Sequence, residues 1–296
     1  MRVAAIIGPG NAAKSLALFQ RITGVEWTAG LQDRPDTVVI FGGDGTIHRH
    51  LAALVDLNLP VLVVPCGSGN DFARVLELRS VPNSVKAWRQ FVEGRNNVRT
   101  IDLGVINHRA SLQSCAGDAP AQRGSSSHGH YFCCIAGVGL DAEIARRANQ
   151  LPKWLRAHGG YALCTPREFF RFAPLPMKIS CGDGSTAQFQ PTILAAVANA
   201  PTYGGGMKIA PHALLDDGKL DICIVRAMDT FKLFCLFPTV YFGRHLSFKE
   251  VEYSQTQQLR IETEFPLDVY ADGEYVCQTP VEFGIGHNAL KVIVPA

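Results

Sequence analysis

Apolar runs and helix-like segments alternate through the first hundred residues. Three runs rich in β-branched residues are separated by stretches in which apolar residues recur every three or four positions. Unbroken apolar runs are typical of strands that are buried on both faces of a parallel sheet, and the segments between them supply the covering helices. The pattern predicts an α/β domain. We expect strands over 2–7, 37–41 and 60–65, and helices over 12–22, over 46–57 and from 70.

The hydrophobic pattern changes after residue 100. Short alternating segments such as "MKISCG", "LDICIVRA" and "QQLRIET" follow one another with turns between them. This is typical of an antiparallel β domain. We therefore expect an α/β domain over 1–100 and a β-rich domain over 101–296, with the extreme C-terminal strand returning to the first domain. The polar, small-residue stretch at 108–130 predicts a flexible insertion.

Composition and charge exclude several classes of protein. The chain has 296 residues, of which 47% are hydrophobic and 18% charged. Its formal net charge of +2 does not indicate binding to nucleic acid. Nine cysteines without a Cys-x-x-Cys pair favour reduced, buried thiols over disulfides or zinc ligands. The N-terminal apolar run is too short for a signal peptide, so we expect a cytoplasmic protein. Residues 231–243 come nearest to a membrane segment, but Lys232 and Pro238 interrupt them, and a core or docking helix is predicted instead.

Glycines follow the second and third predicted strands, where each gives way to a helix. Gly42, Gly43 and Gly45 surround Asp44 in the first of these loops. Backbone N–H groups in such loops, together with the N-terminus of the next helix, can bind phosphate. A carboxylate there would repel phosphate unless a divalent cation lies between them, so the loop predicts a metal–nucleotide site. The alternative is a tight turn in which Asp44 caps its own helix.

The second loop, "CGSGND" from Cys66, is expected beside the first. The carboxyl ends of parallel strands lie at one edge of a sheet, so both loops should face the same crevice. Ser68 could donate to a phosphate, while Asn70 and Asp71 could hold the loop, contact a ribose or cap the next helix. The segment from Gly8 to Lys14 adds a third loop at this edge, without the spacing of a Walker P-loop.

These motifs together resemble a known family. "GGDGT" followed by "PCGSGNDFAR" is similar to the diacylglycerol kinase catalytic-domain superfamily, which includes bacterial lipid kinases and the sphingosine kinases. "GVGLDAEI" from Gly137, "LLDDGKLDICIV" from Leu214 and "ADGE" from Ala271 follow in the family's order and extend the resemblance over most of the chain. The combination is the specific signal, because "GGDG" alone also resembles NAD kinases and phosphofructokinases.

The resemblance implies an ATP-binding domain, a β-sandwich lipid-substrate domain, and ATP- and Mg²⁺-dependent phosphorylation of a lipid hydroxyl between them. Diacylglycerol, giving phosphatidate, is the expected acceptor. The implied proton acceptor is Glu274, with Asp272 beside it and Asp44 as a further catalytic carboxylate. The implied magnesium ligands are Asp217 and the carbonyls of Leu214 and Lys219, with Asp141 joining Asp44 and the metal. The implied ATP contacts are Gly10, Asn11, Lys14, Gly42, Gly43, Asp44, Gly45, Thr46, Arg49, Gly67, Ser68, Asn70 and Asp71.

Other interpretations stay open at this point. "ADGE" is also the sequence of a type I′ hairpin turn, and "LDDG" is also an ordinary turn. His48 and Arg49 stand where the family commonly has Asn-Glu. This departure favours a nucleotide-binding regulatory module without catalysis. An NAD kinase is the rival enzyme, although "GSGNDFAR" differs from that family's second motif. The expected partners are a lipid alcohol and the inner face of a membrane, contacted transiently. The oligomeric state is left open, a homodimer included.

Overall fold

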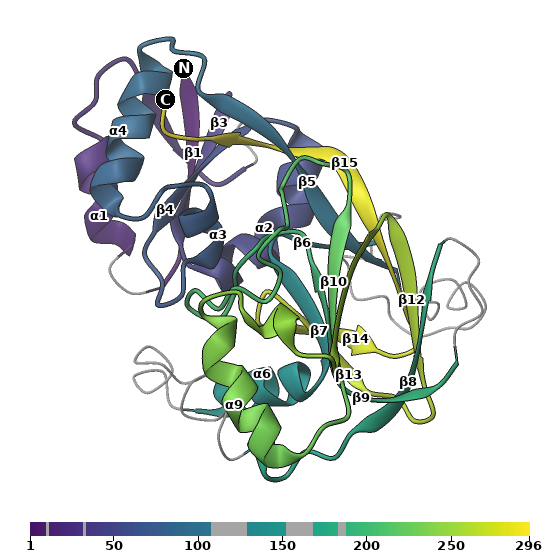
Figure 1. The fold of residues 1–296 in the computed structure, drawn as a ribbon. Coiled ribbons are helices and arrows are strands. Elements are labelled where there is room, and N and C mark those ends of the chain that lie inside the picture. Colours follow the sequence, from purple (N-terminus) through teal and green to yellow (C-terminus); the bar gives the residue numbers. More distant parts are fainter. Residues whose placement is uncertain (10–11, 32–33, 108–128, 152–167, 183–187) are drawn as a thin grey trace.

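Two parts of different architecture follow each other along the chain (Figure 1). The computed structural model describes residues 1–9, 12–31, 34–107, 129–151, 168–182 and 188–296. An α/β part contains the N-terminus, and a mainly antiparallel β part follows it. The predicted fold class is therefore confirmed. Most of the expected insertion, residues 108–128, lies outside the described residues.

The N-terminal part is built on a parallel sheet in the order β2, β1, β3, β4. Every residue of β3 is buried, which explains its unbroken apolar run. The three predicted strands are present, whereas the short β2, "EWTA", has no apolar run that could have revealed it. The bounds are β1 (Arg2–Ile7), β2 (Glu26–Ala29), β3 (Thr37–Gly42) and β4 (Pro60–Pro65).

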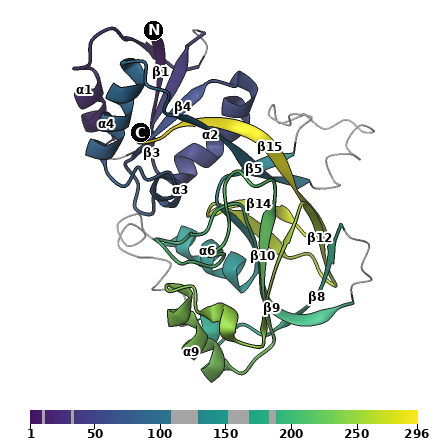
Figure 2. The ribbon, with the colours of Figure 1, turned by 45° about the horizontal axis from the view of Figure 1, so that its top comes forward.

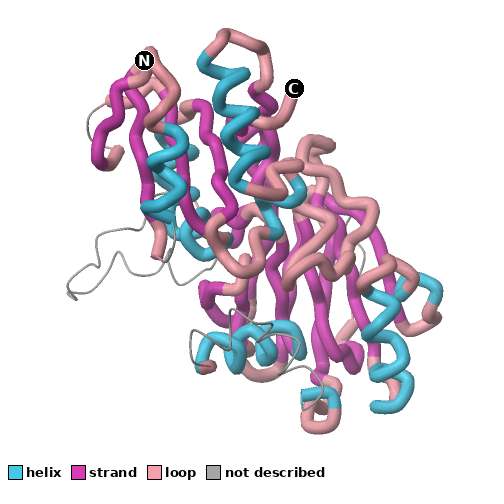
Figure 3. Tube along the Cα trace, turned by 90° about the vertical axis from the view of Figure 1, so that its left-hand side faces the viewer, coloured by secondary structure: helices cyan, strands magenta, loops and turns pink. Residues whose placement is uncertain are grey.

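Helices cover both faces of this sheet (Figures 2 and 3). α1 (Ala12–Phe19) and α4 (Val81–Val92) pack together on one face. α2 (Asp44–Leu57) lies on the other face and buries residues at helical spacing, among them Ile47, Leu51 and Leu54. α3 (Asp71–Val75) is much shorter than the helix expected from residue 70.

The C-terminal part is antiparallel. Its strands run in the order β14, β13, β7, β9, β8, β12, and β10 pairs with both β9 and β11. Alternate residues of β10 enter two different cores. Leu220, Ile222 and Ile224 face the interior of the sandwich, while Cys223 and Val225 face the helices outside it. The bounds are β7 (Ile135–Gly139), β8 (Leu175–Cys181), β9 (Gln190–Ala198), β10 (Leu220–Arg226), β11 (Val251–Thr256), β12 (Gln258–Thr263), β13 (Asp268–Ala271) and β14 (Glu274–Gln278).

Two long strands join the parts. β5 (Val98–Asn107) pairs antiparallel with β15 (Val281–Ile293), and the end of β15 pairs parallel with β4 in the N-terminal sheet. The other end of β15 pairs with β12 in the sandwich. The remaining elements are β6 (His130–Phe132), α6 (Leu140–Gln150), α9 (Thr230–Val240) and η1 (His245–Ser247). Among the helices that the structure describes, none has the length and apolarity that a bilayer span needs.

Candidate active site

The two glycine loops touch each other. β3 and β4 are neighbours, so the loops that follow them leave the sheet side by side. A β-carbon on Gly43 would lie 2.9 Å from the Cα of Gly67, and one on Gly67 would lie 2.5 Å from the Cα of Gly43. Glycine at both positions is therefore needed for the loops to approach, whether or not a phosphate is bound.

Asp44 connects the loops through its carboxylate. It accepts the N–H groups of Asp71 and Phe72, both at 3.1 Å. Asp44 thus caps α3, the helix after the other loop. Burial and then the negative charge of Asp71 raise the pKa of Asp44 to about 6, against the lowering effect of the two amides. Burial also raises the pKa of Asp71. Two carboxylates in this state favour a cation between them.

The second loop is closed by Asn70. This residue has φ 54°, and its side chain accepts the N–H of Gly67 at 2.8 Å and donates to the carbonyl of Gly67 at 2.6 Å. Asn70 therefore holds the loop, one of the roles expected for it. Ser68 is exposed. A β-carbon on Gly69 would lie 2.9 Å from an oxygen of Asp44 and 3.5 Å from one of Asp71, so this glycine leaves room beside both acids.

An acidic network continues from Asp71 into the C-terminal part. Asp71 accepts the N–H of Gly205 at 2.8 Å and an ion pair from Arg74 at 2.9 Å. In the same loop, the hydroxyl of Tyr203 donates to Asp141 at 2.8 Å. Burial raises the pKa of Asp141 to about 6, opposed by the hydrogen bond from Tyr203. The loop that carries Tyr203 and Gly205 therefore connects Asp141 to Asp71.

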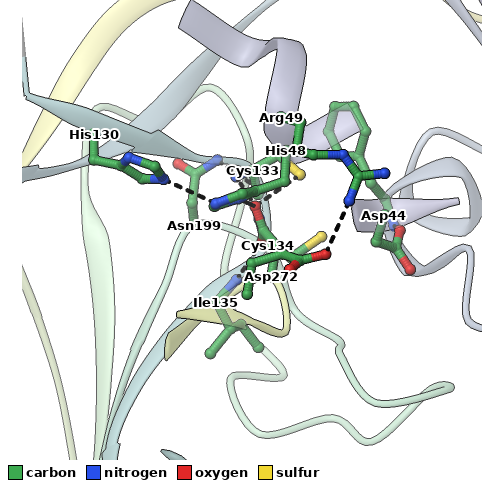
Figure 4. Close-up of polar contacts among 11 residues, drawn as sticks. Asp44, His48, Arg49, His130, Cys133, Cys134, Ile135, Asn199 and Asp272 are labelled. Carbon is green, nitrogen blue, oxygen red and sulfur yellow. Dashed lines mark hydrogen bonds and ion pairs between the residues drawn. The ribbon is translucent and has the colours of Figure 1, made fainter. Parts of the chain in front are cut away.

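The "ADGE" segment forms the tight hairpin turn between β13 and β14, with φ 50° at Asp272 and φ 84° at Gly273. The carboxylate of Asp272 is buried and faces into the molecule (Figure 4). It accepts the N–H groups of Cys133 and Cys134 at 2.9 and 2.8 Å. Its acceptor sites are thus occupied, and Asp272 positions the turn rather than reaching a substrate.

His48 completes the environment of Asp272. The Nδ1 atom of His48 lies 3.1 Å from Oδ2 of Asp272, and its Nε2 atom lies 2.8 Å from Nε2 of His130 (Figure 4). Burial alone would raise the pKa of Asp272, but the hydrogen bond and charge of His48 outweigh it, so that the pKa is lowered. Burial and the adjacent His48 lower the pKa of His130 to about 4.

Glu274 points toward the first glycine loop. A β-carbon on Gly45 would lie 2.5 Å from Oε1 of Glu274, and Arg49 approaches the same oxygen at 3.4 Å. The Glu274 side chain is 41% exposed. Gly45, the third glycine of "GGDGT", therefore makes space for Glu274. Of the two acids of "ADGE", Asp272 is contacted by His48 and Glu274 by Arg49.

The predicted magnesium ligands lie in two places. Asp217 is in the turn before β10, where its carboxylate accepts the N–H of Lys219 at 3.1 Å, and Leu214 is exposed. β7 and β10 flank β9, and both begin opposite its Ala198, at the same end of the sheet, whereas Asp141 follows the other end of β7. Asp217 and Asp141 therefore do not form one cation site.

Asp102, which the sequence analysis missed, holds this turn. Its buried carboxylate accepts the N–H groups of Gly218 at 2.8 Å and Asn288 at 2.7 Å. An acid in the apolar run "TIDLGVI" was the available signal.

The remaining residues predicted to contact ATP differ in how exposed they are. Thr46 is buried, and a β-carbon on Gly42 would lie 2.6 Å from its side chain. Lys14 is exposed on α1. Gly10 and Asn11 lie outside the described residues. Asp272 and the two buried thiols beside it could also be grouped as a metal site, but the Asp272 carboxylate already accepts the N–H groups of Cys133 and Cys134.

The carboxylate pair fits a magnesium–nucleotide. Asp44 and Asp71 supply hard oxygen donors, burial raises the pKa of both carboxyls despite the hydrogen bonds they accept and the ion pair of Asp71 with Arg74, and the glycines beside them leave space. The "LDDG" turn is explained without a cation by Asp102 and by Gly218, which has φ 71°.

Comparisons with known proteins identify the family of this chain. Residues 20–106 match the family model described as diacylglycerol kinase catalytic domain, and residues 134–294 match the one described as YegS C-terminal NAD kinase beta sandwich-like domain. A diacylglycerol kinase of Mycobacterium tuberculosis (strain ATCC 25618 / H37Rv) is 32% identical over 88% of this chain and 77% of that protein. One from Bacillus subtilis (strain 168) is 26% identical over 88% of this chain and 78% of that protein.

Solved structures show the same fold. A crystal structure of a diacylglycerol kinase from Bacillus anthracis str. Sterne superposes with a TM-score of 0.64 and 17% identity, covering 99% of this chain and 96% of that one. The fold and site define a two-domain lipid kinase. The chain belongs to the diacylglycerol kinase catalytic-domain superfamily.

Proposed function

We propose that the protein transfers the terminal phosphate of ATP to the hydroxyl of a lipid alcohol, with diacylglycerol as acceptor, phosphatidate as product and Mg²⁺ as the cation. The observation that carries this proposal is the position of Glu274. Its carboxylate lies against Gly45 of the first glycine loop, on the same edge as Asp44 and Asp71. A proton acceptor, an acidic cation site and phosphate-binding loops are the parts that phosphoryl transfer requires.

Each residue of the site has a defined task in this proposal. The apposed loops bind the phosphates with backbone N–H groups, and Asp44 and Asp71 hold the cation. Mg²⁺, when bound, neutralises negative charge on the phosphates. Glu274 accepts the proton of the lipid hydroxyl. Arg49 orients Glu274 before the substrate arrives and contacts a phosphate afterwards, while Asp272 and His48 fix the turn that carries Glu274.

The proposed place of action is the inner face of a membrane, where ATP and a lipid alcohol are both available. The apolar helix α9 and the lack of a spanning helix among the described residues are compatible with peripheral contact.

The direct test is transfer of labelled phosphate from ATP in mixed micelles with Mg²⁺, using diacylglycerol, a sphingoid base, ceramide and phosphatidylglycerol in parallel. We expect Glu274→Gln to lower kcat by about 10² to 10⁴, with little change in the KM for ATP. Glu264→Gln is the matched control, because Glu264 is an exposed acid in the turn before β13. No turnover by the folded wild-type protein on any of these lipids would overturn the proposal. Transfer to NAD would instead identify the rival kinase, and ATP binding without any transfer would identify a regulatory module.

A further inference from the structure

α9 is apolar on both its faces. Leu233, Leu236 and Val240 are buried against the outer side of the sandwich. The opposite face is also apolar, yet Phe231 is 78% exposed and Phe234 is 50% exposed. Cys235 and Pro238 occupy the other exposed positions of this face. A helix that is apolar all round is normally covered on every side, and α9 lies on the outside of the fold (Figures 1 and 2).

The exposed apolar surface extends beyond the helix. Tyr241 and Phe242 directly follow α9 and are 38% and 73% exposed. Phe170 is 73% exposed, and its neighbour Phe169 packs edge-on against Phe237 of α9 with ring centroids 5.2 Å apart. We call Phe170, Phe231, Phe234, Tyr241 and Phe242 the aromatic face.

Basic side chains lie beside Phe170 and at the C-terminal end of the aromatic face. Arg171 is exposed and follows Phe170. Lys208 and Arg244 are exposed at the C-terminal end of α9, where their backbone N–H groups bond to Val240 and Thr239. Within the part of the chain that the structure describes, no ion pair engages these three side chains. The exposed acid at the other end, Asp229, accepts the N–H of Lys232 as the cap of α9. Exposed aromatic residues with cations at one end match an interface of apolar chains and anionic headgroups.

The aromatic face is connected to the candidate active site. The buried side of α9 walls a cavity of about 40 Å³ that is also lined by Asp141 and Tyr203. Tyr203 begins the loop whose Gly205 contacts Asp71. α9 is thus the layer between solvent and the acidic network.

We propose that the aromatic face of α9 inserts into the surface of an anionic lipid bilayer. The choice of a bilayer as the occupant rests on the proposed function, because a kinase of membrane lipids must reach an acceptor that is held in a bilayer. The cations beside the face select anionic headgroups, and the phenylalanines supply the apolar contact.

The test is sedimentation of the full chain with vesicles of phosphatidylcholine alone and of phosphatidylcholine with phosphatidylglycerol. We expect stronger binding to the anionic vesicles. Phe231→Ser should lower the partition coefficient about tenfold, and Phe231→Ser/Phe242→Ser should lower it further. Phe265→Ser is the matched control, since Phe265 is 74% exposed in the turn between β12 and β13, and it should bind like the wild type. Equal losses in Phe231→Ser and Phe265→Ser would overturn the inference, as would unchanged binding in the double variant.

Two further measurements separate other occupants. The melting temperature of Phe231→Ser/Phe242→Ser should match that of the wild type, and a large decrease would show that the chain itself covers the face. The molar mass from light scattering should be the same in both proteins, and conversion of a wild-type dimer to a monomer would assign the face to a second copy instead.

Activity is assayed separately on soluble dioctanoylglycerol, where the double variant should retain the wild-type rate. If neither protein phosphorylates any lipid, the proposed function fails, and vesicle binding still decides the role of α9.

Discussion

Asp44 is held in a position that is unfavourable for its own charge. Burial and Asp71 raise its pKa to about 6 from the ordinary value of 3.8, so ionised Asp44 lowers the stability of the fold at neutral pH. Functional sites commonly carry such a cost, because the groups are arranged for a ligand rather than for the empty protein.

Asp44→Asn should therefore stabilise the protein while abolishing phosphate transfer. A shift of this size corresponds to an upper limit of about 3 kcal/mol, and loss of one accepted hydrogen bond leaves an expected gain of about 1–2 kcal/mol in the free energy of unfolding at pH 7.5. Because the folded pKa is raised, the favourable contribution of wild-type Asp44 is complete below about pH 4 and lost as the pH rises through 6. The advantage of the variant should thus shrink as the pH falls and become a disadvantage of about 1–2 kcal/mol near pH 4, where only the lost hydrogen bond remains. Urea unfolding across pH 4–8 measures this, and a variant less stable than wild type at pH 7.5 would contradict it.

Asp272 differs from Asp44, because contact with His48 stabilises its ionised carboxylate inside the protein. The His48 side chain is 4% exposed and contacts Asp272, whose side chain is 0% exposed. His48→Ala should lower the free energy of unfolding by about 2–4 kcal/mol, because a buried charge loses its partner. His48→Asn, which can still donate to Asp272, should recover a large part of this. Urea unfolding of the two variants gives the comparison, and equal stability of Ala and Asn would show that His48 acts only by filling space.

At the scale of elements, the contact between the glycine loops depends on the pairing of β3 with β4 and on the absence of side chains at Gly43 and Gly67. Gly67→Ala would place a β-carbon 2.5 Å from the backbone of Gly43, so one loop has to move. We expect the KM for ATP to rise at least about tenfold, because phosphate-binding N–H groups lose their alignment.

Gly284→Ala in β15 is the control, since a β-carbon there meets nothing within 4 Å. Gly45→Ala gives a different result, because its β-carbon meets the flexible ends of Glu274 and Arg49 and no backbone. That variant should lower kcat with little change in stability. Steady-state kinetics at varied ATP separates the two effects, and equal effects of Gly67→Ala and Gly284→Ala on KM would contradict this account.

The elements that sequence reasoning predicted are those with a local signal. β3 and β4 are unbroken apolar runs followed by glycines, so their strands and the shared edge of their loops could be inferred. The role of Asp272 could not, because it depends on amides of residues 133–135 that only the strand register brings beside the turn. The same holds for His130 and Asp102, whose partners are distant in sequence.

At the scale of the whole molecule, β15 makes the two parts depend on each other. Its Val292 is fully buried and pairs with β4 on one side and with β5 on the other, while the start of the same strand pairs with β12. The N-terminal sheet therefore cannot separate from the β-rich part unless the pairing of β15 with one of its neighbouring strands is lost. We therefore expect the α/β and β-rich parts to unfold in one transition.

Two optical probes can test this coupling. Trp27 and Trp88 lie in the N-terminal part with ring centroids 6.0 Å apart, so in a Trp154→Phe background tryptophan fluorescence reports on that part, whereas far-ultraviolet circular dichroism reports on the whole chain. The two melting curves should coincide. Val292→Ala should lower both midpoints together by a few degrees, because it removes about 1–3 kcal/mol of core packing. A fluorescence midpoint that falls while the circular dichroism midpoint stays unchanged would mean that the N-terminal sheet unfolds independently and that β15 does not couple the parts.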